Sequence, residues 1–419
     1  MVLRHSLRRK RPRHDKFSFV KDELCRLNKA NLYRRLNLVA TNNNTANVLV
    51  NGVESINLCS NDYLGLSQNK TVLKMTIEDL NQISQCSSRL LAGNSNELMQ
   101  LEEKLSDHRK TDRALIYPSG YMANIGVIST LANKSTTIYS DEYNHASLID
   151  GCKLSGARIE IFKHNDLEHL EHIIRKGTSD RKIILTETIF SMDGDRSDLQ
   201  GIHNIALRHN VITIVDDSHG DFIYDQVPEL GVALERRHLV DVYISSLSKA
   251  LGCFGGYVAA SEQIIELLIN RSRSFMYSSG LPSHLCSSAL AAIPIATKGN
   301  LQEQLKRNVT FFSSRIEHNG FNAKSCRSKF KSQIIPLIVG DEKLTMQFSK
   351  ALLSDGIFMQ PVRYPTVPLG KARLRASITT SLHLKQLKIA LEKIELSVRD
   401  SILYSWFESE CFESGFVTQ

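Results

Sequence analysis

The sequence lacks the long apolar runs that mark membrane-spanning and export segments. None of its apolar runs reaches the ~18 residues that a membrane-spanning helix needs. No apolar stretch follows the basic start of the chain, so we expect no secretory signal. These absences favour a cytoplasmic protein with no membrane partner.

Cysteine pairs at metal-binding spacing are also missing. Eight cysteines occur in the chain, but none belongs to a Cys-x-x-Cys pair and none clusters with histidine at zinc-finger spacing. We therefore expect reduced thiols, as in an intracellular protein, and no metal site.

Beyond its first residues the chain has little excess charge. The formal net charge is +8, and residues 1–16, with seven Lys or Arg and one Asp, account for +6 of it. A broad basic face is therefore not expected, which argues against nucleic-acid binding as the main role. Three interpretations of this tail stay open: a solvated extension, a short organellar presequence, or a weak contact with an anionic surface.

The rest of the composition is that of a folded protein. Hydrophobic residues make up 42% and charged residues 23% of the 419 residues, which excludes a chain that is mainly disordered. At about 150 residues per domain, this length predicts two or three domains.

From about residue 70, short β-branched runs alternate with helical stretches. This alternation predicts an α/β fold with a mostly parallel seven-stranded sheet covered by helices on both faces. The expected strands are Ala114–Tyr117, Thr136–Tyr139, Ile159–Phe162, Ile183–Thr186, Ile212–Asp216, Val242–Ser245 and Gly256–Ala260. Because ligands bind at the carboxyl ends of such strands, the residues that follow them are the candidates for chemistry.

The two ends of the chain have a different pattern. We expect a helix over 17–36 and a hairpin that turns at Asn51-Gly52. Past residue ~285, helices over 283–297, 300–317 and 383–399 and strands near 333–339 and 374–378 predict a smaller α+β domain. The expected division is a basic tail at 1–16, an N-terminal helix and hairpin at 17–60, a large domain at 61–285, a small domain at 286–399 and a tail at 400–419.

Two of the expected strands are followed by residues suited to Schiff-base chemistry. Lys249 comes after a strand that ends near Ser246, and a buried lysine with a lowered pKa can bind an aldehyde. Asp216 ends another strand, where its carboxylate can pair with a protonated ring nitrogen, and His219 lies three residues on. Taken singly, Lys249 also fits a surface lysine and Asp216 a helix N-cap.

Two further strand ends complete the pattern. Gly120 and Tyr121 begin a helix, where free backbone N–H groups can bind a phosphate. His145 follows a strand and can stack on a planar ring, although a single histidine is more often structural. Pyridoxal phosphate (PLP) requires this combination on one sheet. It needs a cradle for its phosphate, a ring that stacks on it, an acid at its ring nitrogen and a lysine that forms a Schiff base.

An ordered set of motifs connects the chain with a known family. They are Ser-Asn-Asp-Tyr-Leu-Gly-Leu (60–66), Ser-Arg-Leu-Leu-Ala-Gly-Asn (88–94), Ser-Gly-Tyr-Met-Ala-Asn (119–124), Phe-Ser-Met-Asp-Gly-Asp (190–195), Asp-Asp-Ser-His-Gly (216–220), Ser-Leu-Ser-Lys (246–249) and Pro-Thr-Val-Pro-Leu-Gly-Lys-Ala-Arg-Leu-Arg (365–375). With them the chain resembles the α-oxoamine synthases, of the fold-type-I PLP-dependent transferases, from about Asn61 to Leu396. The resemblance implies a homodimer with shared active sites.

The resemblance also implies a role for each matching residue. Lys249 would bind the cofactor and move protons at the substrate, and Asp216 would pair with the pyridine nitrogen. The other implied cofactor contacts are His219 at the phenolic oxygen, His145 on the ring face, Ser191 near that oxygen, Gly120, Tyr121 and Ser246 at the phosphate, and Ser278 or Ser279 at the phosphate of the neighbouring subunit. The implied substrate contacts are Arg375 and Asn61 at the amino-acid carboxylate and Arg34 at the acyl entrance.

Within the family, the segment 363–375 is most similar to that of the 8-amino-7-oxononanoate synthases of biotin synthesis. This similarity implies an acyltransferase that joins L-alanine to a pimeloyl thioester, presented by coenzyme A or by a carrier protein. A glycine C-acetyltransferase is the alternative within the family, and Ser84–Arg89, which replaces a usual glycine-rich stretch, leaves the acyl substrate open. A catalytically inactive subunit is disfavoured because Lys249, Asp216, His219 and His145 are all present.

Overall fold

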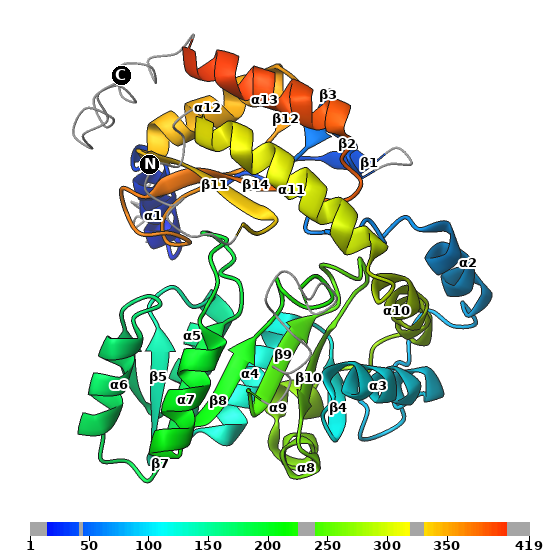
Figure 1. Cartoon of the computed structure of the whole chain (residues 1–419), viewed down its shortest axis with the longest axis vertical. Coiled ribbons are helices and arrows are strands. Elements are labelled where there is room, and N and C mark those ends of the chain that lie inside the picture. Colours follow the sequence, from blue (N-terminus) through cyan, green and yellow to red (C-terminus); the bar gives the residue numbers. More distant parts are fainter. Residues whose placement is uncertain (1–14, 42–44, 225–238, 319–330, 400–419) are drawn as a thin grey trace, which may run out of the picture.

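The computed structural model describes residues 15–41, 45–224, 239–318 and 331–399. Most of the expected tails at 1–16 and 400–419, with Cys411 and also Cys326, lie outside these residues. The described chain forms two lobes, with a large sheet in one and two smaller sheets in the other (Figure 1).

The large sheet has the seven strands expected from the sequence. Its order is β4 (Arg113–Tyr117), β10 (Gly256–Ala260), β9 (Val242–Ser246), β8 (Ile212–Asp216), β7 (Arg181–Glu187), β5 (Thr136–Asp141) and β6 (Arg158–Phe162). Only β10 is antiparallel to its neighbours, so the other strands all present their carboxyl ends at one edge. The central strands are buried along their length, which explains their continuous apolar sequences.

Helices cover both faces of this sheet. One face packs against α4 (Gly120–Leu131), α5 (Ala146–Ser155) and α8 (Glu262–Arg271), and the other against α3 (Asn96–Arg109), α6 (Leu167–Lys176) and α7 (Leu199–His209). The side chains of Ser119, Asp166 and Asp198 accept backbone N–H groups at the starts of α4, α6 and α7. Such N-caps fix where each helix begins after its strand.

The smaller lobe joins segments from both ends of the chain. In its four-stranded sheet, β1 (Val39–Thr41), β2 (Asn47–Val50) and β3 (Val53–Asn57) precede β12 (Ile357–Phe358), which pairs with β3 in parallel. The expected hairpin turn is confirmed, with positive φ at Asn51 and Gly52. The three-stranded sheet consists of β11 (Ile334–Gly340), β14 (Ala372–Ser377) and β13 (Pro361–Val362). The helices of this lobe are α11 (Asn300–His318), α12 (Glu342–Ser354) and α13 (Leu384–Arg399).

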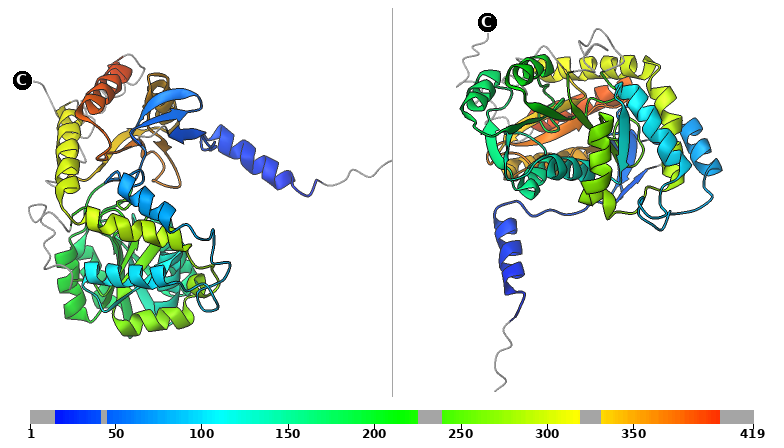
Figure 2. Two further views of the ribbon diagram at one scale, coloured as in Figure 1. Left: turned by 90° about the vertical axis from the view of Figure 1, so that its right-hand side faces the viewer. Right: turned by 90° about the horizontal axis from the view of Figure 1, so that it is seen from below.

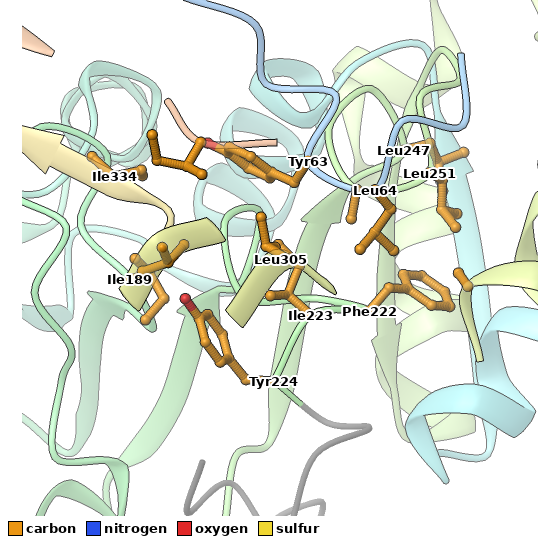
Figure 3. Close-up of a cluster of buried hydrophobic side chains, with 14 of the residues drawn as sticks. Tyr63, Leu64, Ile189, Phe222, Ile223, Tyr224, Leu247, Leu251, Leu305 and Ile334 are labelled. Atoms are coloured by element: carbon orange, nitrogen blue, oxygen red, sulfur yellow. The ribbon is translucent and has the colours of Figure 1, made fainter. Parts of the chain in front are cut away.

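A continuous apolar core links the lobes. Tyr63 and Leu64 meet residues that follow β8 and β9, Leu305 of α11 and Ile334 of β11 (Figure 3). The helix α10 (Ser283–Ala296) leads from the large lobe into α11 and packs against α2 (Lys70–Glu78) and α3. The short α9 (Arg273–Met276) contacts α4 and α8.

The N-terminal helix is shorter than expected. It spans Ser18–Lys29 as α1 and ends before Asn31, which has a left-handed φ of 57°. None of its residues is buried, and the helix stands away from the lobes (Figure 2). Among the described residues, no helix combines the length and apolarity needed to cross a membrane.

Candidate active site

The candidate residues gather at the carboxyl edge of the large sheet. Asp216 ends β8, Glu187 ends β7 and Ser246 ends β9, and these three strands are adjacent. His145 follows β5, and Gly120 follows β4 as the first residue of α4. The sheet therefore brings together residues that are up to 130 positions apart in the sequence.

Asp216 is the buried acid of this cluster, with 6% of its surface exposed. Its Oδ2 atom accepts a hydrogen bond from Asn124 Nδ2 at 2.7 Å, and its Oδ1 atom accepts one from the backbone N–H of Ser218 at 2.9 Å. Two neutral donors hold the carboxylate in one orientation. Its remaining lone pairs can accept a hydrogen bond from a protonated ring nitrogen.

A second buried carboxyl, Glu187, lies beside Asp216 in register across β7 and β8. Burial raises the pKa of Glu187 well above its usual range, and the negative charge of Asp216 raises it further. Its Oε1 atom accepts the backbone N–H of His145 at 2.7 Å, so Glu187 fixes the start of α5. The sequence prediction did not include Glu187, although its position at the end of an expected strand was a signal.

Lys249 lies in the turn between β9 and β10. Burial lowers the pKa of its ammonium group, and the negative charges of Asp216 and Glu187 partly oppose that shift. The turn closes with a hydrogen bond from Gly252 N to Lys249 O at 3.0 Å. A lysine in these surroundings reaches its neutral, nucleophilic form more readily than a solvated one.

His145 is the N-terminal cap of α5 and its ring is accessible to solvent. Its Nδ1 atom lies 2.7 Å from Ser147 Oγ and 3.3 Å from the backbone N of Ser147. These contacts fix the ring at the mouth of the cluster, consistent with the stacking role implied by the family resemblance.

The start of α4 forms a cradle with the end of β9. A Cβ atom added at Gly120 would lie 3.4 Å from Ser246 Cβ and 3.8 Å from Ser218 Oγ. At Gly256 an added Cβ would lie 2.4 Å from Gly120 N, so only glycine fits there. The first turn of α4 has no acidic residue, and the backbone N–H groups of Gly120 and Tyr121 have no partner inside the helix. This arrangement suits an anion.

Tyr63 connects three of the predicted site residues. Its hydroxyl lies 2.8 Å from His219 Nδ1, 3.0 Å from Asn61 Oδ1 and 3.0 Å from the guanidinium of Arg375. Burial lowers the pKa of His219 well below its usual range, and the positive charges of Lys249 and Arg375 lower it further. The sequence prediction missed Tyr63, even though it stands two residues from Asn61 in the same motif.

Not every guanidinium donor of Arg375 has a hydrogen-bond partner in the described chain. Its guanidinium donates to Asn61 Oδ1 at 3.0 Å and to Tyr63, while its buried Nε atom has no hydrogen-bond partner among the described residues. No carboxylate of the described chain pairs with Arg375. An arginine that has no carboxylate partner and lies next to a polar cluster is suited to a ligand carboxylate.

The remaining predicted residues are Arg34, Ser191, Ser278 and Ser279. Arg34 is exposed and donates weakly to Tyr364 O at 3.4 Å and Thr366 Oγ1 at 3.3 Å. Ser191 is buried in the loop after β7. Ser279 is exposed and forms an isolated β-bridge with Ser88, and Ser278 lies next to it, partly buried.

Comparisons with known proteins agree with this arrangement. Residues 53–394 match the family described as "Aminotransferase class I and II". The 8-amino-7-oxononanoate synthase of Thermoanaerobacter pseudethanolicus is 36% identical over 91% of this chain and 97% of its own length. The chain belongs to the α-oxoamine synthases of the class I and II aminotransferase family.

Solved structures of α-oxoamine synthases have the same fold. A serine palmitoyltransferase from S. paucimobilis with a bound PLP–myriocin aldimine superposes with a TM-score of 0.85, at 24% identity, over 93% of this chain and 99% of that one. The 8-amino-7-oxononanoate synthase of Francisella tularensis superposes with a TM-score of 0.70, at 27% identity, over 84% of this chain and 99% of that one. The expected fold-type-I architecture is confirmed.

The residues of the cluster fit PLP, the cofactor expected from the sequence. The cradle at Gly120 and Ser246 suits its phosphate, the oriented carboxylate of Asp216 suits its pyridine nitrogen, and Lys249 suits its aldehyde. The guanidinium of Arg375, which is only partly buried, suits the carboxylate of an amino acid.

Proposed function

We propose that this chain is a PLP-dependent acyltransferase that condenses L-alanine with a pimeloyl thioester. The products would be 8-amino-7-oxononanoate, CO2 and a free thiol, a reaction of biotin biosynthesis. The relative from T. pseudethanolicus carries this name and is matched over nearly its whole length. The observation that carries the proposal is that Lys249 is buried close to both the carboxylate of Asp216 and the guanidinium of Arg375, whose charges act on it.

When bound, PLP supplies an electron sink for the bond that breaks at the amino-acid α-carbon. Asp216, oriented by its two donors, would keep the pyridine nitrogen protonated. Lys249 Nζ would hold the cofactor aldehyde at rest and, once displaced, remove the α-proton of the amino acid, because its lowered pKa favours a neutral amine. His219, held by Tyr63, would contact the phenolic oxygen.

Arg375 and Asn61 would orient the amino acid. The guanidinium would bind the substrate carboxylate, while Asn61 and Tyr63 accept hydrogen bonds from its Nη2 atom and hold it in place. Arg34, at the segment 364–366, would line the path of the acyl thioester. Ser191 would lie near the phenolic oxygen of the cofactor.

We also infer that two copies of the chain share their active sites. Ser279 is exposed in the single chain, and Leu91 and Tyr277, close in sequence to Ser88 and Ser279, are exposed at 84% and 71%. Exposed apolar side chains next to a site residue suit an interface between copies. Ser279, or its neighbour Ser278, would then reach the phosphate of the other subunit. The cytoplasmic location stays a prediction of the sequence.

A comparison of two substrate pairs tests the function. Thiol release is followed with L-alanine plus pimeloyl-CoA and, separately, with glycine plus acetyl-CoA, on protein loaded with PLP. We expect faster release with the first pair. Faster release with the second pair would contradict the biotin assignment and favour a glycine C-acetyltransferase with the same cofactor residues.

A further inference from the structure

A buried asparagine in α4 connects two residues of the candidate site. Asn124 has 2% of its surface exposed. Its Nδ2 atom lies 2.7 Å from Asp216 Oδ2 and 2.8 Å from Ser147 Oγ. Ser147 Oγ in turn lies 2.7 Å from His145 Nδ1. A continuous chain of hydrogen bonds therefore runs from the acid of the site to its exposed histidine.

The direction of each hydrogen bond follows from the donors available. An ionised carboxylate only accepts, so the amide nitrogen of Asn124 must face Asp216. The second hydrogen of that nitrogen goes to Ser147 Oγ, which accepts it. The Ser147 hydroxyl proton is then free for His145 Nδ1, toward which the Ser147 backbone N–H also points. Nδ1 is thereby an acceptor, and the ring proton of neutral His145 belongs on Nε2.

We propose that Asn124 is a positioning residue that orients Asp216 toward the pyridine nitrogen and, through Ser147, sets the Nε2–H tautomer of His145. The inference rests on the proposed function, which gives Asp216 and His145 their cofactor contacts. The side-chain amide of Asn124 thus sets the orientation of Asp216, the group at the ring nitrogen, and the tautomer of His145, the group on the ring face.

Packing alone does not explain an asparagine at this position. The Oδ1 atom of Asn124 is buried without a hydrogen-bond partner in the described chain, which costs stability. An apolar side chain of similar volume would avoid this cost. The two hydrogen bonds that Nδ2 donates are what such a side chain would lose.

The first test measures the dissociation constant of PLP for the cofactor-free full chain by fluorescence titration. We expect Asn124→Ala to raise this constant about tenfold, since it removes a charge-assisted hydrogen bond to Asp216. The matched control is Asn308→Ala, because Asn308 is equally buried and its amide also donates twice, to Thr379 O and Leu382 O. If Asn124→Ala stays within about twofold of the parent, or if Asn308→Ala loses as much, the proposal is wrong.

Asp216→Asn separates this inference from the proposed function. If Asp216→Asn leaves PLP binding unchanged, the role of Asp216 itself is refuted. If it weakens binding while Asn124→Ala does not, only the role of Asn124 is refuted. Asn124→Leu, which keeps a similar volume but loses the donors without adding a charge, carries the same test should Asn124→Ala be insoluble.

The second test reads the tautomer directly. In full-length protein with 15N-labelled histidine, the ring nitrogens of His145, assigned by their loss in His145→Gln, should show a protonated Nε2 and an unprotonated Nδ1. Ser147→Ala should leave PLP affinity within about threefold, because Asn124 still holds Asp216, and should weaken the tautomer preference, which then depends on the backbone N–H of residue 147 alone. A protonated Nδ1 in the parent protein would overturn the proposal.

Discussion

Lys249 is the residue on which the proposed chemistry depends most. Burial lowers its pKa, and the negative charges of Asp216 and Glu187 partly oppose that shift. We expect Lys249→Ala to abolish the visible absorbance of the bound cofactor and to reduce turnover by at least ~10²-fold, the contribution typical of a general acid–base. Lys153→Ala, on the exposed side of α5, is the control and should leave both unchanged. Normal turnover in Lys249→Ala would refute the site.

Arg375 should affect the amino acid and not the cofactor. It contacts Asn61 and Tyr63 and has no hydrogen bond to Asp216 or to the start of α4 in the described chain. We expect Arg375→Ala to raise the KM for L-alanine by roughly tenfold or more, while the dissociation constant of PLP stays within about twofold. Steady-state kinetics and cofactor titration measure the two quantities. A change in PLP affinity with an unaltered KM would contradict the role.

The sequence predicted the residues at strand ends better than the residues that hold them. Asp216, Lys249, His145 and Gly120 each follow an apolar run whose end is visible in the sequence, and the structure brings them to one edge. Asn124, Tyr63 and Glu187 were not singled out. Their importance lies in contacts with residues 23 to 312 positions away, and no local periodicity carries that information.

At the scale of elements, a buried charge network fixes α3 against the loop after β8. Arg109, at the end of α3, lies 2.8 Å from a carboxylate oxygen of Asp217 and 2.8 Å from one of Asp221. Both acids lie within five residues of Asp216. Since removing one partner leaves buried charges uncompensated, we expect Arg109→Ala to lower the free energy of unfolding by about 3–5 kcal/mol. Denaturant unfolding measures it.

The control for this prediction is an arginine with an exposed pair. Arg113 lies 3.9 Å from Glu266 at the surface, and Arg113→Ala should change the free energy of unfolding by less than about 1 kcal/mol. If both variants lose a similar free energy of unfolding, the buried Arg109 network stabilises the fold no more than a surface ion pair does, and the prediction is wrong.

A second cluster holds the loop that carries Ser191. His164 Nδ1 lies 2.8 Å from Asp141 Oδ1 and its Nε2 lies 2.6 Å from Asp195 Oδ2. Burial opposes the charged ring, but the hydrogen bonds to both acids prevail and raise the pKa of His164 to about 10. The raised value means that the folded chain keeps a proton that the unfolded chain loses above pH ~6.5.

The pH dependence of stability follows from this sign. The contribution of His164 is fully present below about pH 6.5 and is lost as the pH rises through about 10. The difference in Tm between the parent and His164→Gln should therefore shrink steadily from pH 6 to pH 10.5 on thermal melts, a range set by the two pKa values. His172→Gln, at an exposed position of α6, should show no such trend. A Tm difference that is constant with pH would contradict the protonated state of His164 between Asp141 and Asp195.

The long elements were more predictable than the short ones. The seven strands of the large sheet and helices α10, α11 and α13 all have clear periodicity and were expected within a few residues. The two-residue strands β12 and β13 were missed because two residues show no alternation. Their pairing with β3 and β14 is decided by tertiary contacts, which also place the N-terminal hairpin beside a strand 300 residues later.

At the scale of the whole molecule, the described lobes are joined by contacts that pass through the site. Gln333, just before β11, donates to His219 O at 2.7 Å and accepts from the Tyr224 hydroxyl at 2.6 Å. Arg375, on β14 in the same lobe as Gln333, donates a hydrogen bond to the hydroxyl of Tyr63. Arg375 and Asp216 thus belong to different lobes, and their relative position depends on the shared core.

Completion of the site by a second copy is the prediction at this scale. Ser279→Asp would set a carboxylate against the cofactor phosphate, and Lys249→Ala removes the catalytic amine, so each homodimer should be inactive. If Ser279 acts on the neighbouring subunit, a mixed dimer places both defects in one site and leaves the other intact. Random mixing of the two variants should then restore about a quarter of the parent activity, because half of the dimers carry one good site of two.

The same mixture gives the opposite result if each chain builds its site alone. Both sites of a mixed dimer would then carry one defect, and thiol release would stay at the level of the separate variants. Light scattering on the mixture provides the control, since dimers must form and exchange for either outcome to count. Because Ser279 is exposed in the single chain, we expect recovery.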